Sequence, residues 1–478
     1  MMQNKSFGKN LFLVASSRGA SLVSSVFAGF LIPKFFSVSD YGFYKVFTLY
    51  AVYTALLHFG FVDGILLKLS GKSYNELDFS EMRTYTRFFI AFETCISLLM
   101  MAICLIFLHG DYLFIAAMLA VNMVFVNATT YYQFISQAVQ RFGEYSAKSL
   151  IASVAKLLFV SGLFVAFYFG KAGISYRVYL IGLNIIDFSM LAWYVFIYRE
   201  ITFGKAVPIR SMKKDISDIF KTGIILTMAY QVSHLVLALD RQFVNALFST
   251  ETFAVYSFAY NIVTMISTMI SSASVVLLPM LKKAEPATLT KFYKKSISTV
   301  SVIAAFSLFA YFPLSPFIEW FLPNYTDSIQ YISIVLPAFL FTAVITIVMF
   351  TLAKVLDMSW DFFKESCIVL LLGFITNAIA YIVFKSPQSI SYASLLVMII
   401  WFVISGSKLK SKTSVGVQHE LFYLITVSAG FLAVTGILKG YVRGFFIFAV
   451  WLVLWTAVFY HQEIKKVLSA VRRKITEK

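Results

Sequence analysis

The sequence predicts an all-α integral membrane protein with about fourteen transmembrane helices. Hydrophobic residues make up 60% of the 478 residues, charged residues make up only 13%, and the mean hydropathy is +0.81. A bilayer core is roughly 30 Å thick and needs about 20 helical residues to cross. Apolar stretches of that order follow one another from Leu11 to Tyr460. This composition excludes an ordinary soluble domain.

Runs of apolar residues between short polar connections define the predicted spans. They are Leu11–Phe36, Tyr44–Leu67, Phe88–Leu108, Tyr112–Ala138, Leu150–Phe169, Val178–Tyr198, Phe220–Leu247, Phe253–Leu281, Ile297–Phe317, Ile329–Ala353, Ser366–Phe384, Ile390–Ser405, Glu420–Leu438 and Gly444–Tyr460. The first span is too long for the apolar core of a signal peptide and carries Arg18 in its middle, so we expect an uncleaved helix. The connections leave no room for a separate soluble domain.

Basic residues alternate between the two sides of the predicted bundle. If the N-terminus is cytoplasmic, most of the 40 Lys and Arg residues fall in cytoplasmic loops and in the two termini. By the positive-inside rule both termini are then cytoplasmic and the number of spans is even. The net charge of +17 is spread over short loops beside helix ends. It therefore favours contact with anionic membrane lipids, and no nucleic acid partner is expected.

The cysteines and histidines predict no metal site. Cys95, Cys104 and Cys367 all fall within predicted spans, and no Cys or His spacing matches that of a metal centre. We expect no metal and no cofactor, although coupling to a proton or sodium gradient is compatible with the intramembrane acids described below.

A short internal repeat predicts two halves. The segment FSVSDYGFY at 36–44 is similar to FSTETFAVY at 248–256, and each joins the first two helices of a half. Two parallel six-helix halves place the repeats at equivalent positions. The predicted organisation is an N-lobe at 1–205, a C-lobe at 206–407, and two additional helices with a basic cytoplasmic tail at 408–478.

Charged residues inside the predicted spans are the candidates for function. A charge at the centre of a membrane helix costs about 2.5–3.5 kcal/mol on insertion scales, so it faces a cavity or a partner. The candidate substrate-binding residues are Arg18, Lys156, Asp240 and Arg241. The candidate ion-coupling residues are Asp63, Glu93 and Asp187. Apolar spans with buried charges are typical of a membrane transporter for a polar or anionic substrate.

Each candidate also has a structural interpretation. The guanidinium of Arg18 offers a fork of donors that fits phosphate oxygens, but it could instead pair between helices or extend to the interface. Asp240 and Arg241 point about 100° apart on a helix and need not pair with each other. Asp187 could simply neutralise a neighbouring Lys or Arg. Since acids and bases within the spans balance, the sequence shows no cavity of net positive charge.

Several segments resemble one transporter family. The run NLFLVASSRGASLVSSVFAGFLIPKFFSVSDYGFYKVF resembles the opening of the polysaccharide repeat-unit flippases (Wzx-type) of the multidrug/oligosaccharidyl-lipid/polysaccharide exporter superfamily. Asp240-Arg241, the segment LLPMLKK and the segment FLPNYTDSIQYISIVLPAF resemble that family at corresponding places.

The resemblance implies a two-lobed bundle of six plus six helices around a central cavity, two extra C-terminal helices, and alternating access across the bacterial inner membrane. The implied cargo is an oligosaccharide on undecaprenyl diphosphate, carried from the cytoplasmic to the periplasmic leaflet for O-antigen or other surface polysaccharide. A polymerase and a chain-length regulator of the same pathway are implied partners. A polar cavity can carry such a headgroup while the polyprenyl tail remains in lipid.

Three other functions remain open. Within the superfamily these are a lipid II flippase and a multidrug exporter. An integral-membrane polysaccharide polymerase or ligase is the competing enzyme class. Such enzymes carry catalytic acids or bases on sizeable external loops, whereas the external connections here are very short. We therefore expect no enzymatic activity.

Overall fold

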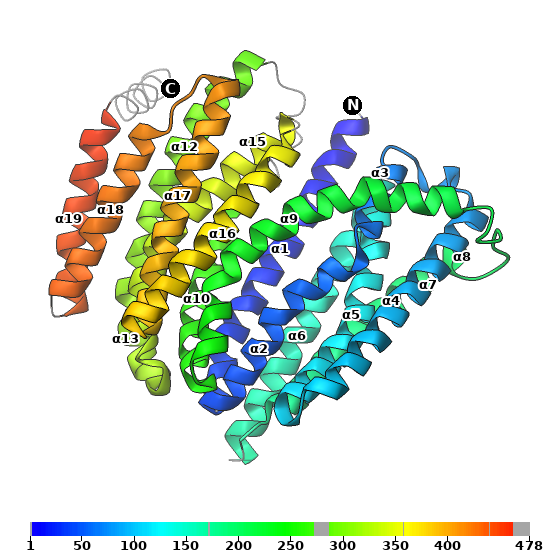
Figure 1. Cartoon of the computed structure of the whole chain (residues 1–478), viewed down its shortest axis with the longest axis horizontal. Coiled ribbons are helices and arrows are strands. Elements are labelled where there is room, and N and C mark those ends of the chain that lie inside the picture. Colours follow the sequence, from blue (N-terminus) through cyan, green and yellow to red (C-terminus); the bar gives the residue numbers. More distant parts are fainter. Residues whose placement is uncertain (1, 171–172, 272–285, 357, 439, 462–478) are drawn as a thin grey trace. The chain divides into compact units, whose positions relative to one another are not determined.

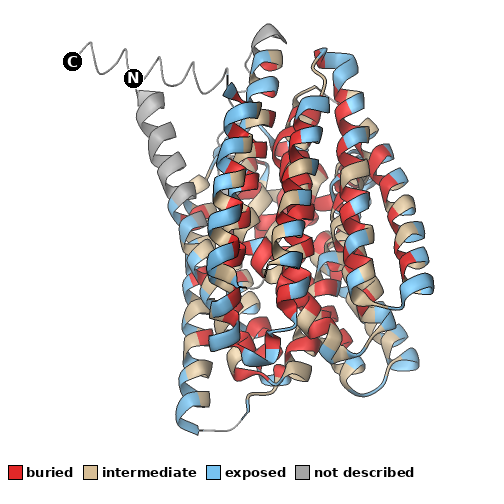
Figure 2. Ribbon diagram, turned by 90° about the vertical axis from the view of Figure 1, so that its left-hand side faces the viewer, coloured by how far each residue is buried: buried red, intermediate tan, exposed pale blue. Residues whose placement is uncertain are grey.

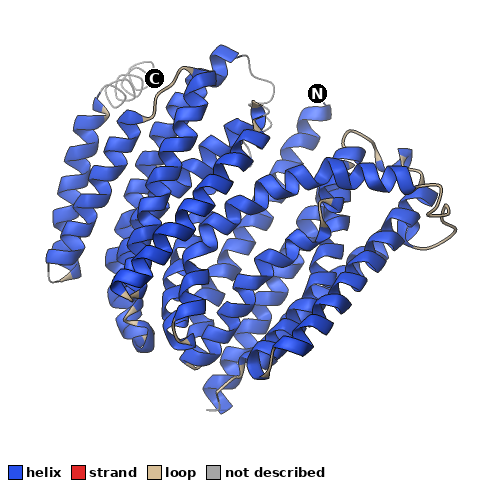
Figure 3. Ribbon diagram, viewed as in Figure 1, coloured by secondary structure: helices blue, strands red, loops and turns tan. Residues whose placement is uncertain are grey.

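The structure is a computed structural model that describes residues 2–170, 173–271, 286–356, 358–438 and 440–461, and within these ranges all regular structure is helical (Figure 1, Figure 3). Side chains are described for the same residues except 2–15, 18, 269–271 and 286–288. The α-helices are α1 (Met2–Phe35), α2 (Val38–Thr54), α3 (Phe61–Leu69), α4 (Phe79–Phe107), α5 (Gly110–Ala138), α6 (Phe142–Gly170), α7 (Tyr176–Ile197), α8 (Arg199–Thr202), α9 (Lys213–Leu247), α10 (Thr250–Ser271), α12 (Pro286–Ser307), α13 (Tyr311–Phe321), α14 (Ser328–Val344), α15 (Phe350–Val355), α16 (Ser359–Phe384), α17 (Pro387–Thr413), α18 (Gln418–Ile437) and α19 (Tyr441–Phe459).

The prediction of an all-α multi-pass membrane protein is confirmed. Among the described residues, 11 helices are long and apolar enough to cross a membrane, or up to 12 if a bent pair counts as one span. The predicted number of fourteen is not confirmed. Helix α1 covers Met2–Phe35, and of it only the segment Gly19–Phe35 could be tested as a span, because the side chains before it are in part outside the described residues. The predicted eighth span, Phe253–Leu281, extends beyond the described residues, and the segment LLPMLKK lies outside them.

The second predicted span is a bent pair of helices. The sequence predicts one helix at Tyr44–Leu67, whereas α2 ends at Thr54, a 3₁₀ turn follows, and α3 leaves at an angle of 57°. The cause is local, since Phe59 and Gly60 have left-handed backbone angles of φ 47° and φ 85°. Only glycine adopts such angles without cost, so the sequence His-Phe-Gly-Phe stops the helix at this point.

Several helices begin earlier than hydropathy predicts. Helix α4 begins at Phe79 instead of Phe88, because the Asp78 carboxylate accepts hydrogen bonds from the backbone N–H groups of Ser80 (2.8 Å) and Glu81 (3.3 Å). Helix α6 likewise begins at Phe142 instead of Leu150. An apolar run marks only the part of a helix that lies in hydrocarbon, and polar first turns continue outside it.

The chain divides into two compact units. The first comprises Met1–Asn261 with Ser359–Phe374, and the second comprises Ile262–Met358 with Ile375–Lys478. The lobes predicted at 1–205, 206–407 and 408–478 are defined by helix order instead and stay a prediction.

Buried faces, in red, alternate with exposed faces along the helices (Figure 2).

The two repeated segments adopt the same turn in the first unit. The Ser37 hydroxyl accepts a hydrogen bond from the Asp40 backbone N–H (3.0 Å) and so caps α2. The Ser249 hydroxyl accepts one from the Thr252 backbone N–H (3.2 Å) at the start of α10. The similarity of the two sequences therefore corresponds to two equivalent helix starts.

Close contacts at glycine residues join α3 to α9 and α2 to α10. A Cβ on Gly64 of α3 would lie 2.1 Å from the Ile219 carbonyl oxygen of α9, and one on Gly223 would lie 1.9 Å from the Gly60 carbonyl oxygen. At the start of α2, a Cβ on Gly42 would lie 2.5 Å from the Thr250 carbonyl oxygen. Hydrogen atoms fit in these spaces and side chains do not.

An ionic cluster fixes the helix ends near the first repeat. The Asp40 carboxylate accepts a hydrogen bond from the Tyr176 backbone N–H (3.0 Å) at the first residue of α7. The Tyr176 hydroxyl donates to Asp111 of α5, and the Arg177 guanidinium donates to the same carboxylate (2.8 Å). We call Asp40, Asp111, Tyr176 and Arg177 the α7 clasp, since they tie α2 and α5 to the start of α7.

The second unit is built around α14. Most of its span, Ser328–Val355, is buried, because α12, α17 and α18 all pack on α14. The two C-terminal helices pack against each other and against α12 and α13. Close packing of Gly430 against Trp451, and a hydrogen bond from the Trp455 indole N–H to the Thr426 hydroxyl (2.9 Å), hold this pair.

Candidate functional site

A polar cavity of about 480 Å³ lies in the first unit. Its walls come from α1, α2, α5, α6 and α7, and Asn261 of α10 closes one edge by donating to the Gly29 carbonyl oxygen (3.2 Å). The apolar wall residues Val126, Val160 and Leu183 alternate with polar ones. A polar cavity inside an apolar bundle is typical of a ligand site.

Three lysines line the cavity. Lys45 comes from α2, while Lys148 and Lys156 come from α6. One aspartate, Asp187 of α7, also lines it. Since three ammonium groups face one carboxylate, the formal charge of the lining is positive, in contrast to the balance that the sequence suggested. Such a lining attracts an anion.

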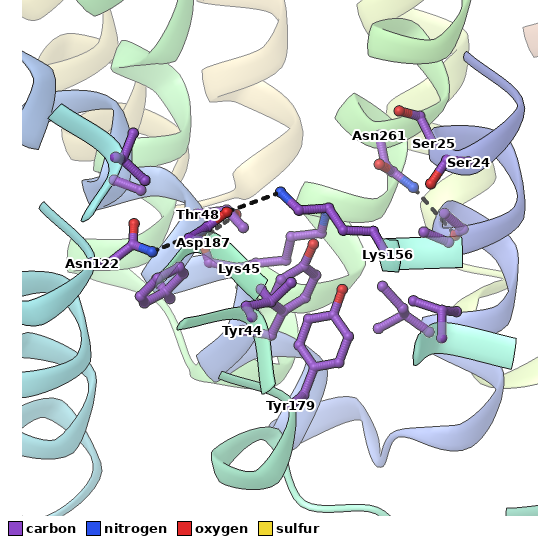
Figure 4. A pocket seen from close by; sticks show the side chains of 18 of the residues that line it. Ser24, Ser25, Tyr44, Lys45, Thr48, Asn122, Lys156, Tyr179, Asp187 and Asn261 are labelled. Atoms are coloured by element: carbon purple, nitrogen blue, oxygen red, sulfur yellow. Dashed lines mark hydrogen bonds and ion pairs between the residues drawn. The ribbon is translucent and has the colours of Figure 1, made fainter. Parts of the chain in front are cut away.

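Asp187 is held by two neighbours. Its Oδ1 lies 3.7 Å from the Lys156 Nζ, and its Oδ2 accepts a hydrogen bond from the Asn122 Nδ2 (2.9 Å). Figure 4 shows both side chains reaching Asp187 from opposite sides. The contact between Asp187 and Lys156 is the one expected if Asp187 neutralises that lysine. The ion-coupling role of Asp187 stays a prediction.

The other two lysines have no carboxylate partner within ion-pair distance among the described residues. Lys45 lies over two aromatic rings, with its Nζ 5.0 Å from the ring centroid of Tyr41 and 5.2 Å from that of Tyr44. Tyr44 in turn lies edge-on to Tyr179, with 5.0 Å between centroids (Figure 4). Aromatic faces stabilise an ammonium group without neutralising it, so its charge remains available to a ligand.

Hydroxyl groups cover much of the remaining wall. They belong to Ser24, Ser25, Thr48, Thr129 and Thr130. Hydroxyl and amide side chains can exchange hydrogen bonds with the hydroxyls of a sugar. The lining thus combines cationic groups with neutral donors and acceptors.

Asp240 and Arg241 do not line this cavity. Asp240 is buried and accepts hydrogen bonds from the hydroxyls of Tyr256 (2.8 Å) and Tyr260. The Arg241 guanidinium lies over the Tyr260 ring at 4.8 Å and donates to the Leu237 carbonyl oxygen (3.2 Å). The two side chains therefore bind other partners, and their predicted role in substrate binding is untested.

Glu93 lies behind the cavity wall. It is completely buried, and its Oε2 accepts a hydrogen bond from the Asn127 Nδ2 (3.0 Å), which also donates to the carbonyl oxygen of the lining residue Thr54 (3.2 Å). Its Oε1 has no hydrogen-bond partner in the described part of the chain. Glu93 is thus connected to the lining through one amide.

Asp63 belongs to the contact between α3 and α9. Its carboxylate accepts a hydrogen bond from the Thr227 hydroxyl (2.5 Å) and lies 3.9 Å from the His58 Nε2. The side chain of Arg18 lies outside the described residues, so its predicted role stays a prediction. The candidates that the structure brings together in the cavity are Lys156 and Asp187.

Sequence reasoning missed Lys45 and Lys148. Both lie at edges of the predicted spans, and hydropathy assigned them to loops. In the structure Lys45 is two turns inside α2, which starts at Val38, and Lys148 is about two turns inside α6. The cap at Ser37 was the available signal for the first, since it places the helix start well before the apolar run. Within the described ranges, no group of three or more His, Cys, Asp or Glu side chains could hold a metal ion.

No family model matches the chain, and no curated protein matches it in sequence. Solved structures do match. The lipid II flippase MurJ in an inward closed conformation has a TM-score of 0.73 at 13% identity, over 95% of this chain and 100% of that one. The chain has the fold of a membrane transporter.

Two further structures extend the similarity. A transporter of the MOP superfamily from Pyrococcus furiosus has a TM-score of 0.58 at 9% identity, over 84% of this chain and 96% of that one. The Vibrio cholerae MATE transporter VcmN in its bent form has a TM-score of 0.54 at 12% identity, over 89% of this chain and 100% of that one. At these identities the similarity concerns the fold, and function has to be argued from the site.

Proposed function

We propose that this protein is a flippase for undecaprenyl-diphosphate-linked oligosaccharide repeat units, which it moves from the cytoplasmic to the periplasmic leaflet by alternating access. The observation that carries the proposal is the cavity with Lys45, Lys148 and Lys156 facing the single carboxylate of Asp187. Unpaired cations inside an apolar bundle are costly unless a ligand or water compensates them. A diphosphate supplies that compensation.

The chemistry of the lining fits both parts of such a headgroup. Lysine ammonium groups bind phosphate oxygens as point charges, and the hydroxyls of Ser24, Thr48 and Thr129 can bond to sugar hydroxyls. A polyprenyl tail needs no polar cavity and can remain in lipid throughout. The fold of a membrane transporter supports translocation as the activity, and no enzymatic step is proposed.

Several features belong to the proposal as a whole. The cargo serves O-antigen or another surface polysaccharide, so the protein lies in the bacterial inner membrane with both termini cytoplasmic. A polymerase and a chain-length regulator of the same pathway are its proposed partners. Coupling to a proton or sodium gradient would use Glu93, Asp187 or Asp63. Asp240 and Arg241 would act outside the cavity described above.

A lipid II flippase is the second candidate, favoured by the similarity in fold to MurJ. A multidrug exporter is supported by the MATE transporters of similar fold. For a cationic drug the three lysines are unfavourable, since like charges repel in a site of low dielectric. A flippase for an anionic lipid therefore fits the cavity better than an exporter of cations.

Flipping by purified protein in vesicles tests the proposal. A fluorescent undecaprenyl-diphosphate-linked oligosaccharide would be placed in both leaflets, and an impermeant quencher would report how fast the inner label reaches the outer leaflet. Charge-assisted hydrogen bonds to phosphate are strong, so Lys45→Gln and Lys148→Gln should each weaken apparent affinity about tenfold or more. The exposed Lys213→Gln is the matched control and should flip at the normal rate.

Two outcomes would contradict the proposal. Normal affinity in the triple variant Lys45→Gln, Lys148→Gln, Lys156→Gln would reject an anionic cargo in this cavity. Restoration of growth in cells lacking their lipid II flippase, without restoration of surface polysaccharide in cells lacking a repeat-unit flippase, would select the second candidate.

Arg18→Ala is a separate arm of the test, in which we expect lost export at normal abundance and partial recovery in Arg18→Lys.

A further inference from the structure

A second pocket lies at the helix ends of the first unit that charge asymmetry predicts to be cytoplasmic. Its volume is about 720 Å³, and its lining comes from the α3–α4 connection, the start of α6, the end of α7 and α8. The lining includes Tyr74, Arg141, Glu144, Phe196, Arg199 and Glu200. It shares no residue with the cavity of the proposed function.

Arginine side chains from α4 hold the backbone of α8, which contributes to the pocket lining. The Arg83 guanidinium of α4 donates to the carbonyl oxygens of Glu200 (2.8 Å) and Lys205 (2.9 Å), and Arg87 donates to that of Gly204 (2.6 Å). These three bonds fix the backbone of α8 and of the segment after it. The side chains of the pocket are therefore displayed on a rigid surface.

One basic residue of the pocket is already engaged. The Arg141 guanidinium lies between two rings, 4.5 Å from the centroid of Tyr74 and 5.2 Å from that of Tyr198, and it forms an ion pair with Glu144. Stacking and pairing together hold this guanidinium in place. Arg141 thus forms a wall of the pocket and keeps the Tyr74 ring in position.

The adjacent residues Arg199 and Glu200 are less engaged. The Arg199 guanidinium lies 5.8 Å from the Phe196 ring and forms no ion pair with any described carboxylate. The Glu200 carboxylate accepts one long hydrogen bond, from the Tyr74 hydroxyl (3.3 Å). Burial and the nearby Glu200 raise the pKa of Tyr74 to about 12, so this hydroxyl stays a donor at neutral pH. Among the described groups, an unpaired cation and a lightly bound anion thus line the same pocket.

The aromatic ring of Phe196 extends the pocket toward the lipid. Phe196 is in the last turn of α7, a candidate membrane span, and 69% of its surface is exposed. Arg199 follows directly after that span. Aromatic and basic residues in this arrangement are typical of the level of lipid headgroups.

We infer that this pocket binds the headgroup of a membrane glycerophospholipid with an ethanolamine group, with its phosphate on Arg199, its ammonium on Glu200 and its acyl chains along Phe196. The opposite charges of these two lining residues match the opposite charges of the headgroup. The ammonium carries N–H donors for the Glu200 carboxylate, which a choline headgroup lacks. A glycerol headgroup has no cation at all, so it leaves Glu200 facing the lipid phosphate without compensation.

The experiment measures lipid retention on the full-length protein. Purified protein in detergent would receive equal amounts of dioleoyl phosphatidylethanolamine, phosphatidylcholine and phosphatidylglycerol, and native mass spectrometry would count the lipids bound. We expect phosphatidylethanolamine to be retained about tenfold more strongly than either other lipid, as for one charge-assisted hydrogen bond. The double variant Arg199→Gln, Glu200→Gln should lose that preference.

The controls keep fold and charge constant. The exposed pair Arg210→Gln, Glu251→Gln removes the same charges elsewhere and should keep the preference. Tyr74→Phe removes only the hydroxyl that holds Glu200 and should reduce the preference in part, which covers the case of a poorly folded double variant. Equal retention of the three lipids, or an unchanged preference in the double variant, would overturn the inference. Full displacement of the lipid by soluble phosphoethanolamine would also overturn it, since the site would then bind a soluble metabolite.

Discussion

Lys156 and Asp187 form an ion pair whose two roles can be separated by substitution. In the structural role, Asp187 neutralises Lys156, and removing one partner leaves a charge uncompensated in a bundle of low dielectric. In the binding role, Lys156 also holds the cargo diphosphate. Asp187→Asn alone should lower abundance in the membrane, and the double variant Lys156→Gln, Asp187→Asn should restore it.

Flipping distinguishes the two roles in the double variant. If Lys156 binds the cargo, the double variant reaches the membrane in normal amount and still flips poorly. Quantitative blotting of membranes and the vesicle assay are the two measurements. Normal flipping by the double variant would show that the pair is structural only and that Lys45 and Lys148 suffice for binding.

Glu93 is the residue at which the predicted ion coupling can be tested most directly. An ionised carboxylate without a cationic partner is costly when it is completely buried, whereas an amide at the same place can still accept from Asn127. Glu93→Gln should therefore keep its thermal stability within about 1 kcal/mol. If Glu93 carries the coupling proton, this variant should lose the pH dependence of flipping, whereas the exposed control Glu251→Gln should keep it. An unchanged pH profile in Glu93→Gln would remove Glu93 from the coupling role.

The residues of the site show how far sequence reasoning reaches. Lys156 and Asp187 were found because a charge deep in an apolar run stands out. Lys45 and Lys148 were not found, because a charge near the end of such a run looks like a loop residue until the helix start is known. Whether a helical charge faces a cavity, as Lys156 does, or two tyrosine hydroxyls, as Asp240 does, depends on how the helices pack.

At the scale of elements, the α7 clasp predicts a loss of stability when it is opened. The Asp40 carboxylate accepts from the first N–H group of α7 and places a negative charge at a helix N-terminus. Asp40→Ala should cost about 1 kcal/mol of stability, as for other helix caps. The exposed Asp218→Ala is the control. Thermal denaturation followed by fluorescence size-exclusion chromatography measures both, and equal melting of the two variants would mean that the cluster holds nothing together.

Helix order could be predicted from the sequence, whereas helix geometry could not. Hydropathy placed the apolar parts of α4 to α7 and of α16 to α19, because crossing a bilayer requires long apolar runs, but it missed the polar first turns of α4 and α6. The bend between α2 and α3 was missed, because both arms are apolar and only Phe59 and Gly60 mark it. The repeat at 36–44 and 248–256 was informative because it encodes a cap, and a cap requires specific residues at specific spacing.

At the scale of the whole molecule, the glycine contacts predict which conformational changes transport requires. Helices α2 and α3 contact α10 through Gly42 and α9 through Gly64, all within the first unit. If the protein works by the proposed alternating access, one of these contacts opens at a time. Gly64→Ala should force α3 from α9 and expose a cysteine placed at the buried Gln231 to an impermeant maleimide. Gly162→Ala, where a Cβ meets nothing within 4 Å, should not.

The opposite contact can be tested by a cross-link. Ser39 lies one turn before Gly42, so cysteines at Ser39 and Thr250 should join under oxidation and arrest export, with reduction restoring it. The parent protein first needs Cys95, Cys104 and Cys367 replaced, since all three are free thiols. Efficient cross-linking with export at its normal rate would mean that this end never opens, and rocking of the lobes would then be ruled out.

The close glycine contacts also determine which glycines can be replaced in related proteins. At Gly42, Gly64 and Gly223 a Cβ would lie within about 2.5 Å of backbone atoms, and no change of rotamer relieves such a clash. We therefore expect glycine at these positions in every relative that keeps the same close helix contacts. Gly143 and Gly162 have open space around the missing Cβ and are free to become alanine or serine. Related sequences can therefore be classified by these five positions. Glycine at 42, 64 and 223, together with varied residues at 143 and 162, would indicate a chain with the same close helix contacts.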